Sequence, residues 1–160
     1  MIHRFSTLAG RLRAELSELE RTVRRAEKLM RQAQKTGDDG YVDGVALNLH
    51  AFYSGIEHLL ETIGNEIDGS LPSGQDWHRD LLIQMTASLP EIRPPVLQRE
   101  TRNCLDEYRS FRHVVRHVYT FQLKAARVQQ LVDDLADCYH AIQRDIETFA
   151  RFLEKMAADE

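Results

Sequence analysis

The sequence is poor in the residues that mark disulfide-rich, fibrous or disordered chains. Its 160 residues include only two cysteines, four prolines and eight glycines. Two cysteines cannot build a framework of several disulfides, and so little glycine and proline excludes a collagen-like or linker-rich chain. A chain of this length, 42% hydrophobic, can bury about 70% of its unfolded surface around one core. We therefore expect a single domain, residues 1–160.

Long hydrophobic runs are also missing. No segment approaches the ~20 apolar residues that cross a bilayer, and the N-terminus has no apolar stretch of signal-peptide length. Cys104 and Cys138 lie in segments of helical pattern, and we interpret them as small buried hydrophobes with reduced thiols in preference to a bridge. These features predict a cytoplasmic protein without a membrane partner.

Charge is distributed unevenly along the chain. The formal net charge of −4 argues against a polycation that coats nucleic acid. However, residues 1–36 carry nine basic and four acidic side chains, and residues 95–127 carry seven and three. The intervening and C-terminal segments are acidic. Each basic block is long enough for a helix, so a local surface for nucleic acid is compatible with the negative total.

Apolar residues recur at steps of three and four almost throughout, which indicates amphipathic helices. The expected helices cover residues 8–33, 41–68, 76–89, 97–118 and 125–160. Glycine and proline clusters separate them, and Pro95 is expected in the first turn of the fourth helix. No stretch of strict alternation indicates a strand. We predict an all-α antiparallel up-and-down bundle of four long helices and one short one.

The end of the fourth predicted helix concentrates side chains that can do chemistry. An ideal helix places three arginines, two histidines and a tyrosine on one exposed face. They are Arg109, Arg112, His113, Arg116, His117 and Tyr119. A guanidinium pairs with two phosphate oxygens, and an imidazole transfers protons near neutral pH. The combination suits metal-independent RNA cleavage, in which a ribose 2′-hydroxyl attacks its own 3′-phosphate.

Other interpretations fit parts of this pattern. By periodicity alone, a basic helix face with two histidines is usually a solvated face. The spacing of His113 and His117 can hold Zn²⁺, but the Glu of His-Glu-x-x-His is missing and three arginines disfavour a cation. Asp137 and His140 have carboxylate–histidine spacing without the paired Glu-x-x-His motifs of a di-iron bundle. We expect no metal and no cofactor.

Residues 112–119, Arg-His-Val-Val-Arg-His-Val-Tyr, contain the pattern Arg-x4-His-x-Tyr. This pattern resembles the motif of the HepT-like ribonuclease toxins of the HEPN superfamily. Residues 52–60, Phe-Tyr-Ser-Gly-Ile-Glu-His-Leu-Leu, resemble the second-helix segment of the same family. The resemblance implies a HEPN-like bundle that acts as a homodimer, with motifs from both subunits lining one cleft that cleaves RNA, tRNA being one candidate.

The resemblance also implies roles for individual residues. Arg112 would bind and stabilise the phosphate, His117 would act as general acid/base, and His113 would assist. Two neighbouring arginines would bind RNA phosphates: Arg109 and Arg116. Tyr119 would be the tyrosine that a minimal nucleotidyltransferase antitoxin modifies with AMP, which places negative charge in the RNA cleft.

Two functions of other classes stay open. One is a non-catalytic HEPN helical module that binds and positions a nucleotidyltransferase partner, and the other is a plain helical interaction protein. The intact Arg-x4-His favours the nuclease, because a scaffold has no chemical need for it. Glu57 is expected to make a buried hydrogen bond or to pair with an arginine. An N-terminal basic face that includes Arg21 and Arg24 is interpreted as solvated, with an extended RNA track as the alternative.

Overall fold

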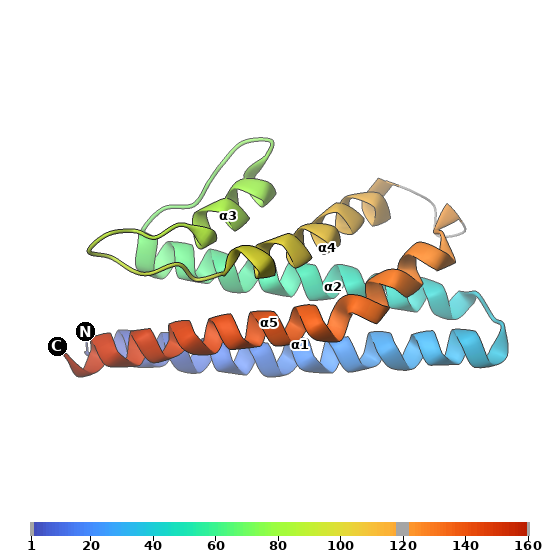
Figure 1. The fold of residues 1–160 in the computed structure, drawn as a ribbon, viewed down its shortest axis with the longest axis horizontal. Helices are drawn as coiled ribbons and strands as arrows, with labels where there is room; N and C mark the ends of the chain where they lie inside the picture. Colours follow the sequence, from blue (N-terminus) through green and yellow to red (C-terminus); the bar gives the residue numbers. More distant parts are fainter. Residues whose placement is uncertain (1, 118–121, 160) are drawn as a thin grey trace.

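The chain folds into an all-α bundle in the computed structural model, which describes residues 2–117 and 122–159 (Figure 1). The elements are α1 (Ile2–Thr36), α2 (Gly40–Ile63), the π-helical segment η1 (Gly64–Asp68), α3 (Trp77–Thr86), α4 (Arg99–His117) and α5 (Ala125–Ala158). The long helices α1, α2, α4 and α5 alternate in direction. No strand occurs in the two described ranges, and the predicted all-α antiparallel bundle is confirmed.

Glycines end two helical segments in a backbone conformation that other residues rarely adopt. Gly37 follows α1 with a φ of 73°, and Gly69 follows η1 with a φ of 74°. Because glycine has no Cβ atom, it enters this left-handed region at little cost, and the helical hydrogen-bond ladder stops there. The chain therefore turns back at both predicted breaks.

The loop before α4 is tied to the short helix α3. The backbone amides of Val96 and Leu97 both donate to the carbonyl of Met85, at 2.8 and 3.0 Å. These bonds hold the loop against α3, and α4 begins only at Arg99. The prediction that Pro95 lies in the first turn of this helix is therefore wrong.

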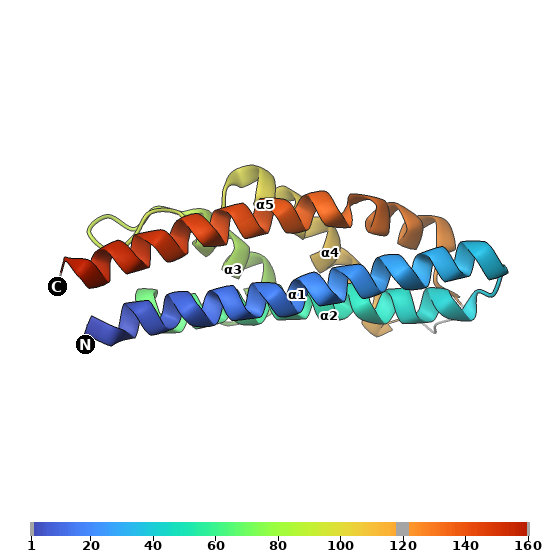
Figure 2. The same ribbon diagram turned by 90° about the horizontal axis from the view of Figure 1, so that it is seen from below.

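Helix α1 packs lengthwise against both α2 and α5 and supplies one wall of the core (Figure 2). The apolar residues that recur at steps of three and four along α1 are buried from Leu8 to Met30, each at or below 5% exposed. Apolar residues of the other helices join the same buried cluster. Since burial of apolar surface contributes roughly 25 cal/mol per Å², this shared cluster stabilises the arrangement of the helices.

Helix α4 is held against α2 on one side and α5 on the other. The ring of Phe52 in α2 meets Tyr108 of α4 edge-on, with ring centroids 5.5 Å apart. The Tyr108 hydroxyl donates to the carbonyl of Leu131 in α5 at 2.7 Å. Just before α4, the backbone amide of Gln98 donates to the carboxylate of Asp145 at 2.9 Å. These contacts fix the position of α4 in the bundle, and with it the position of the motif at its C-terminal end.

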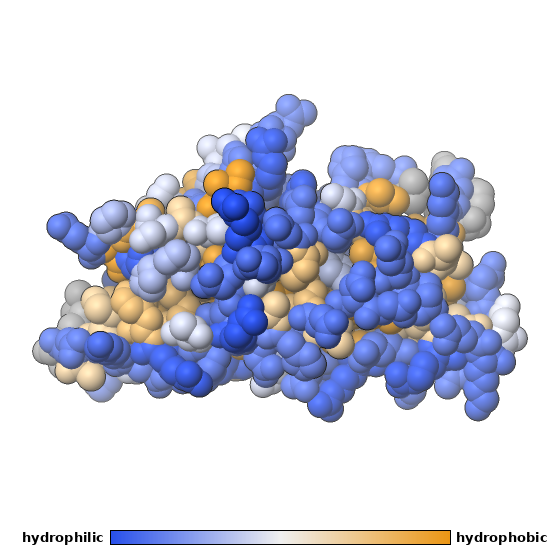
Figure 3. All heavy atoms as spheres, viewed as in Figure 1, coloured by the Kyte–Doolittle hydropathy of each residue, from blue (hydrophilic) through white to orange (hydrophobic). Residues whose placement is uncertain are grey.

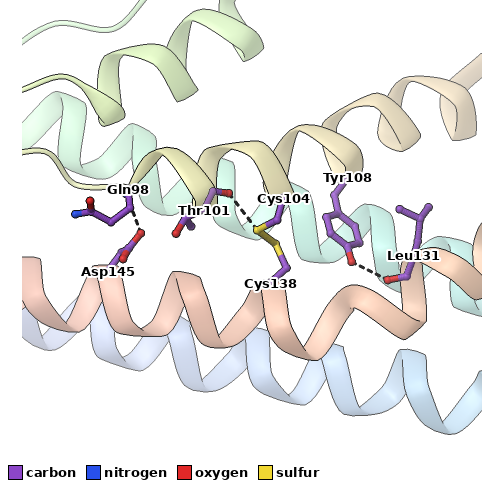
Figure 4. Close-up of a disulfide and its surroundings, with 7 residues drawn as sticks. All are labelled: Gln98, Thr101, Cys104, Tyr108, Leu131, Cys138 and Asp145. Atoms are coloured by element: carbon purple, nitrogen blue, oxygen red, sulfur yellow. Dashed lines mark hydrogen bonds between the residues drawn. A yellow bond between two sulfur atoms is a disulfide. The ribbon is translucent and has the colours of Figure 1, made fainter.

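A disulfide joins Cys104 of α4 to Cys138 of α5 (Figure 4). Their Cα atoms lie 5.8 Å apart, a separation that a disulfide spans. The prediction that both cysteines carry reduced thiols is therefore wrong. Their separation of 34 residues did not reveal the pairing, because only the packing of α4 on α5 brings them face to face. The cysteines thus do not support a reducing compartment.

The surface is mainly polar. Most of the face drawn in Figure 3 is hydrophilic, with hydrophobic residues in smaller patches between the helices. The large exposed hydrophobic residues are Leu47, Ile83, Ile92, Val114 and Met156. Of the helices in the described ranges, none has the length and apolar character needed to cross a membrane.

Candidate functional site

The predicted site residues on α4 divide into two groups. Arg109 and Arg112 are half-buried, whereas His113, Arg116 and His117 are exposed. Arg109 and Arg112 lie near enough to the buried Tyr53 of α2 for their charges to oppose the rise that burial causes in its pKa. The prediction of one fully exposed face is therefore corrected, because α2 covers one edge of it.

The two histidines of the motif lie side by side. The ring centroids of His113 and His117 are 4.4 Å apart, and the ring planes are tilted by 49°. Residues four apart share a helix face one turn along, which explains the contact. Because both rings are exposed at the end of α4, a single ligand can reach both.

The two half-buried arginines have different surroundings. Nε of Arg109 donates to the carboxylate of Asp106 at 2.7 Å, and this hydrogen bond raises the pKa of Arg109 against the opposing effect of burial. Nε of Arg112 is buried and has no hydrogen-bond partner among the described residues. Since buried N–H groups nearly always have a partner, Arg112 is the arginine of the two whose Nε donor is left unused among the described residues.

Tyr119, the predicted modification site, lies outside the described residues. The described part of α4 runs to His117. The other predicted site residues all lie within the last turns of α4.

Two α2 residues with no predicted role, His50 and Tyr53, lie near the arginines at the end of α4. His50 is half-buried, and burial, followed by the charges of Arg112 and Arg116, lowers its pKa. The Tyr53 hydroxyl is buried and has no hydrogen-bond partner in the described ranges. Burial, followed by the charge of Glu57, raises the pKa of Tyr53, so the phenol keeps its proton. The spacing of three and four from His50 to Glu57 was the available signal, because it places all three residues on one face.

Glu57 is anchored to α3. Its carboxylate accepts a hydrogen bond from Nδ1 of His78 at 2.6 Å, with Glu57 only 5% exposed. The ring of Trp77 lies over His78, with centroids 3.7 Å apart. The predicted buried hydrogen bond of Glu57 is confirmed, and its partner is a histidine of α3.

The groove between α4 and α5 does not suit an anion such as phosphate. A groove of about 480 Å³ between α4 and α5 has an acidic lining that repels phosphate. Its acidic residues are Glu100, Glu107, Asp134 and Asp137. Within the part of the chain that the structure describes, no group of three or more His, Cys, Asp or Glu side chains could hold a metal ion.

The basic face of α1 is partly neutralised within its own helix. Arg21 pairs with Glu18 at 3.4 Å and Arg24 with Glu20 at 2.7 Å, with both arginines largely exposed. Pairs of this kind on a helix surface are typical of solvated faces. The contacts favour that interpretation over an extended RNA track.

The fold and the site together define an all-α bundle whose fourth helix ends in an arginine–histidine cluster beside the second helix. Residues 44–153 match the family of HepT-like proteins. The chain therefore belongs to this family of the HEPN superfamily, as its motifs predict. Comparisons with curated proteins and with solved structures gave no match. The matched residues include the α2 segment around Tyr53 and the whole of α4.

Proposed function

We propose that the protein is a metal-independent endoribonuclease toxin of a toxin–antitoxin pair. One observation carries the proposal: in a chain of the HepT-like family, Arg112 and His117 stand in Arg-x4-His-x-Tyr spacing at the end of α4. The family is of the HEPN ribonuclease type. A helix that only positioned a partner would have no chemical use for this pair of side chains.

The side chains of the site suit the chemistry of RNA cleavage. Arg112, with Arg109 and Arg116 on the same side, binds the scissile and neighbouring phosphates and offsets the charge that develops on phosphorus. His117 acts as general acid/base on the ribose and leaving-group oxygens, and the adjacent ring of His113 assists. A 2′-hydroxyl of the RNA is the nucleophile, and the residues require no metal for this step.

The arrangement of the two motif residues supports a homodimer. Arg112 is half-buried near Tyr53 of α2, whereas His117 is exposed at the end of α4. A two-fold partner can bring the His117 of one subunit to the arginines of the other across a shared cleft. We propose that residues 1–160 act as one HEPN domain in such a dimer.

The proposed regulator is a minimal nucleotidyltransferase that transfers AMP to Tyr119. The added phosphate would repel RNA phosphate from the arginines of α4 and fill part of the cleft. RNA as substrate and an enzyme antitoxin as partner place the pair in the cytoplasm. Co-expression with the antitoxin should raise the intact mass by one or more AMP units, and Tyr119→Phe should prevent the increase.

Incubation of the purified protein with total RNA, followed by mapping of the new RNA ends, tests the nuclease. Arg112→Ala and His117→Ala should each lower the cleavage rate by about 10²–10⁴-fold, the usual contribution of such groups. Arg99→Ala, at the exposed opposite end of α4, and His140→Ala, exposed on α5, serve as matched controls that should cleave normally. Cleavage unchanged in both motif variants would contradict the proposal and favour a non-catalytic module.

A further inference from the structure

We propose that His50 of α2 is a further catalytic residue of this site, the general base that removes the proton from the attacking 2′-hydroxyl. This inference rests on the ribonuclease function proposed above and divides its acid/base work between two histidines. His50 then acts as the base, and His117 acts as the acid.

The register of α2 and α4 brings His50 to the motif. The edge-on contact of Phe52 with Tyr108 sets these two residues level on antiparallel helices. At 1.5 Å per residue, His50 lies about 3 Å from Phe52 along the axis, and Arg112 lies about 6 Å from Tyr108 in the same direction. His50 and Arg112 are therefore nearly level with each other, with Arg116 one turn further along α4.

The face of α2 that carries His50 is also turned toward α3 and α4. His50, Tyr53 and Glu57 follow one another at steps of three and four, so they form one stripe. Glu57 at the far end of the stripe is bonded to His78 of α3. On α4, arginines at the same spacing form the opposing stripe: Arg109, Arg112 and Arg116. The end of α2 that carries His50 thus faces the arginines of the motif.

Two polar atoms that lie between these stripes depart from the usual pairing of buried donors. The Tyr53 hydroxyl and Nε of Arg112 both lack a hydrogen-bond partner among the residues described. Tyr53 is only 1% exposed, so bulk water does not readily solvate its hydroxyl. A shift of either side chain would bring its donor to an oxygen of RNA phosphate or ribose, the kind of acceptor that both groups bind.

The surroundings of His50 keep its ring neutral, as a base requires. Arg112 and Arg116 from α4 are the cationic groups that act on it, and Glu57 of its own helix opposes them. Tyr53 on the same stripe stays uncharged. Burial and the two guanidiniums outweigh Glu57, so the pKa of His50 falls below the usual value for an imidazole. An unprotonated ring is then available near neutral pH.

The step balances with these two histidines. A ring nitrogen of neutral His50 takes the 2′-hydroxyl proton while the 2′-oxygen forms a bond to phosphorus. The bond from phosphorus to the 5′-oxygen breaks, and the leaving 5′-oxygen takes a proton from protonated His117. The products are a 2′,3′-cyclic phosphate and a 5′-hydroxyl end. Exchange with solvent returns His50 to its neutral form and His117 to its protonated form.

Single-turnover cleavage measured between about pH 5 and pH 9 tests the assignment. His50→Gln should lower the rate at neutral pH by about 10²–10⁴-fold and leave RNA binding nearly unchanged. It should also remove the fall in rate on the acidic side, which in the wild type reflects protonation of the base. Added imidazole should restore part of the activity of His50→Ala.

His58→Gln is the matched control for His50→Gln, because it makes the same change on the same helix. The His58 ring is 69% exposed and lies 3.7 Å from Glu15 of α1. It should cleave as the wild type does.

A measurement on the unaltered protein covers the case in which the variants misfold. An NMR titration of the wild-type histidines should give His50 a pKa below about 6.5 that coincides with the acidic kinetic pKa. A His50 pKa that differs from the kinetic one, or a folded His50→Gln that cleaves at the wild-type rate with the same pH profile, would overturn the assignment.

The same assays separate this inference from the proposed function. Cleavage that Arg112→Ala abolishes and His50→Gln leaves intact would remove His50 from the mechanism and retain the nuclease. Failure of the wild-type protein to cleave any RNA would overturn the nuclease, and the role of His50 with it.

Discussion

Arg93 shows how one side chain can anchor a connection that has no regular structure. Its side chain is completely buried, and all five of its N–H donors have acceptors. Two donate to the carboxylate of Asp68 at 2.6 and 2.7 Å, and the others donate to three backbone carbonyls. A guanidinium is the one side chain with enough fixed donors for this task. Arg93 therefore joins η1, α3 and the loop before α4.

Arg93→Ala should lower the free energy of unfolding by about 3–5 kcal/mol, because it leaves the Asp68 carboxylate buried without its partner. Urea denaturation monitored by circular dichroism measures the change. Arg79→Ala is the matched control, since its contacts with Asp76 and Asp80 at 3.8 and 3.6 Å are exposed and should contribute about 0–1 kcal/mol. Equal losses in the two variants would contradict this account of Arg93.

The sequence did not distinguish these two arginines. Both lie in the acidic segment 37–94, and local spacing says nothing about which carboxylate each one meets. The sequence did not single out His50 either. This residue follows a buried leucine on α2, and the arginines whose charges lower its pKa lie more than sixty residues away in the chain. Burial and long-range partners decide the role of each residue.

At the scale of the element, α4 is bonded to α5 along its first turns and is exposed at its C-terminal end. Asp145 holds its beginning, the disulfide holds its middle, and Tyr108 bonds to α5 beyond that (Figure 4). In the last turns, the charges of Arg112 and Arg116 reach α2, whereas the rings of His113 and His117 are exposed. The contacts with α5 thus hold the helix in place and leave the two histidines accessible.

Reduction of the disulfide between Cys104 and Cys138 should lower the free energy of unfolding by about 3–4 kcal/mol, because it frees a closed loop of 34 residues in the unfolded chain. Urea unfolding with and without a reductant measures the difference. The double variant Cys104→Ser and Cys138→Ser should match the reduced protein and should not respond to the reductant. Unchanged stability of the wild type on complete reduction would show that the bridge does not stabilise the fold.

At the scale of the whole molecule, the exposed hydrophobic residues bear on the proposed dimer. Leu47 on α2 is 66% exposed, and Val114 within the motif of α4 is 44% exposed. Both lie on the two helices that form the candidate site. The proposed dimer predicts that a second subunit covers both side chains.

Light scattering at micromolar concentration should therefore give about twice the chain mass of 18.5 kDa. Leu47→Glu and Val114→Glu should shift the protein toward the monomer, because a charge buried in the interface would lose its hydration. Ile83→Glu, at a residue on α3 that is 49% exposed, should leave the dimer intact. A wild-type monomer would contradict the shared cleft, whatever the variants do.

By itself, the sequence determined the helical class, the helix seams and the family. These depend on periodicities and motifs within single segments, such as the seam from Leu8 to Met30 and the run from Arg112 to Tyr119. Only the tertiary structure decided which segments meet. It paired Cys104 with Cys138, gave Glu57 its partner in α3 and brought His50 within reach of the charges of Arg112 and Arg116. The physical reason is that each of these pairings joins different helices, and the spacing of residues within one helix shows which face is buried but not which helix covers it.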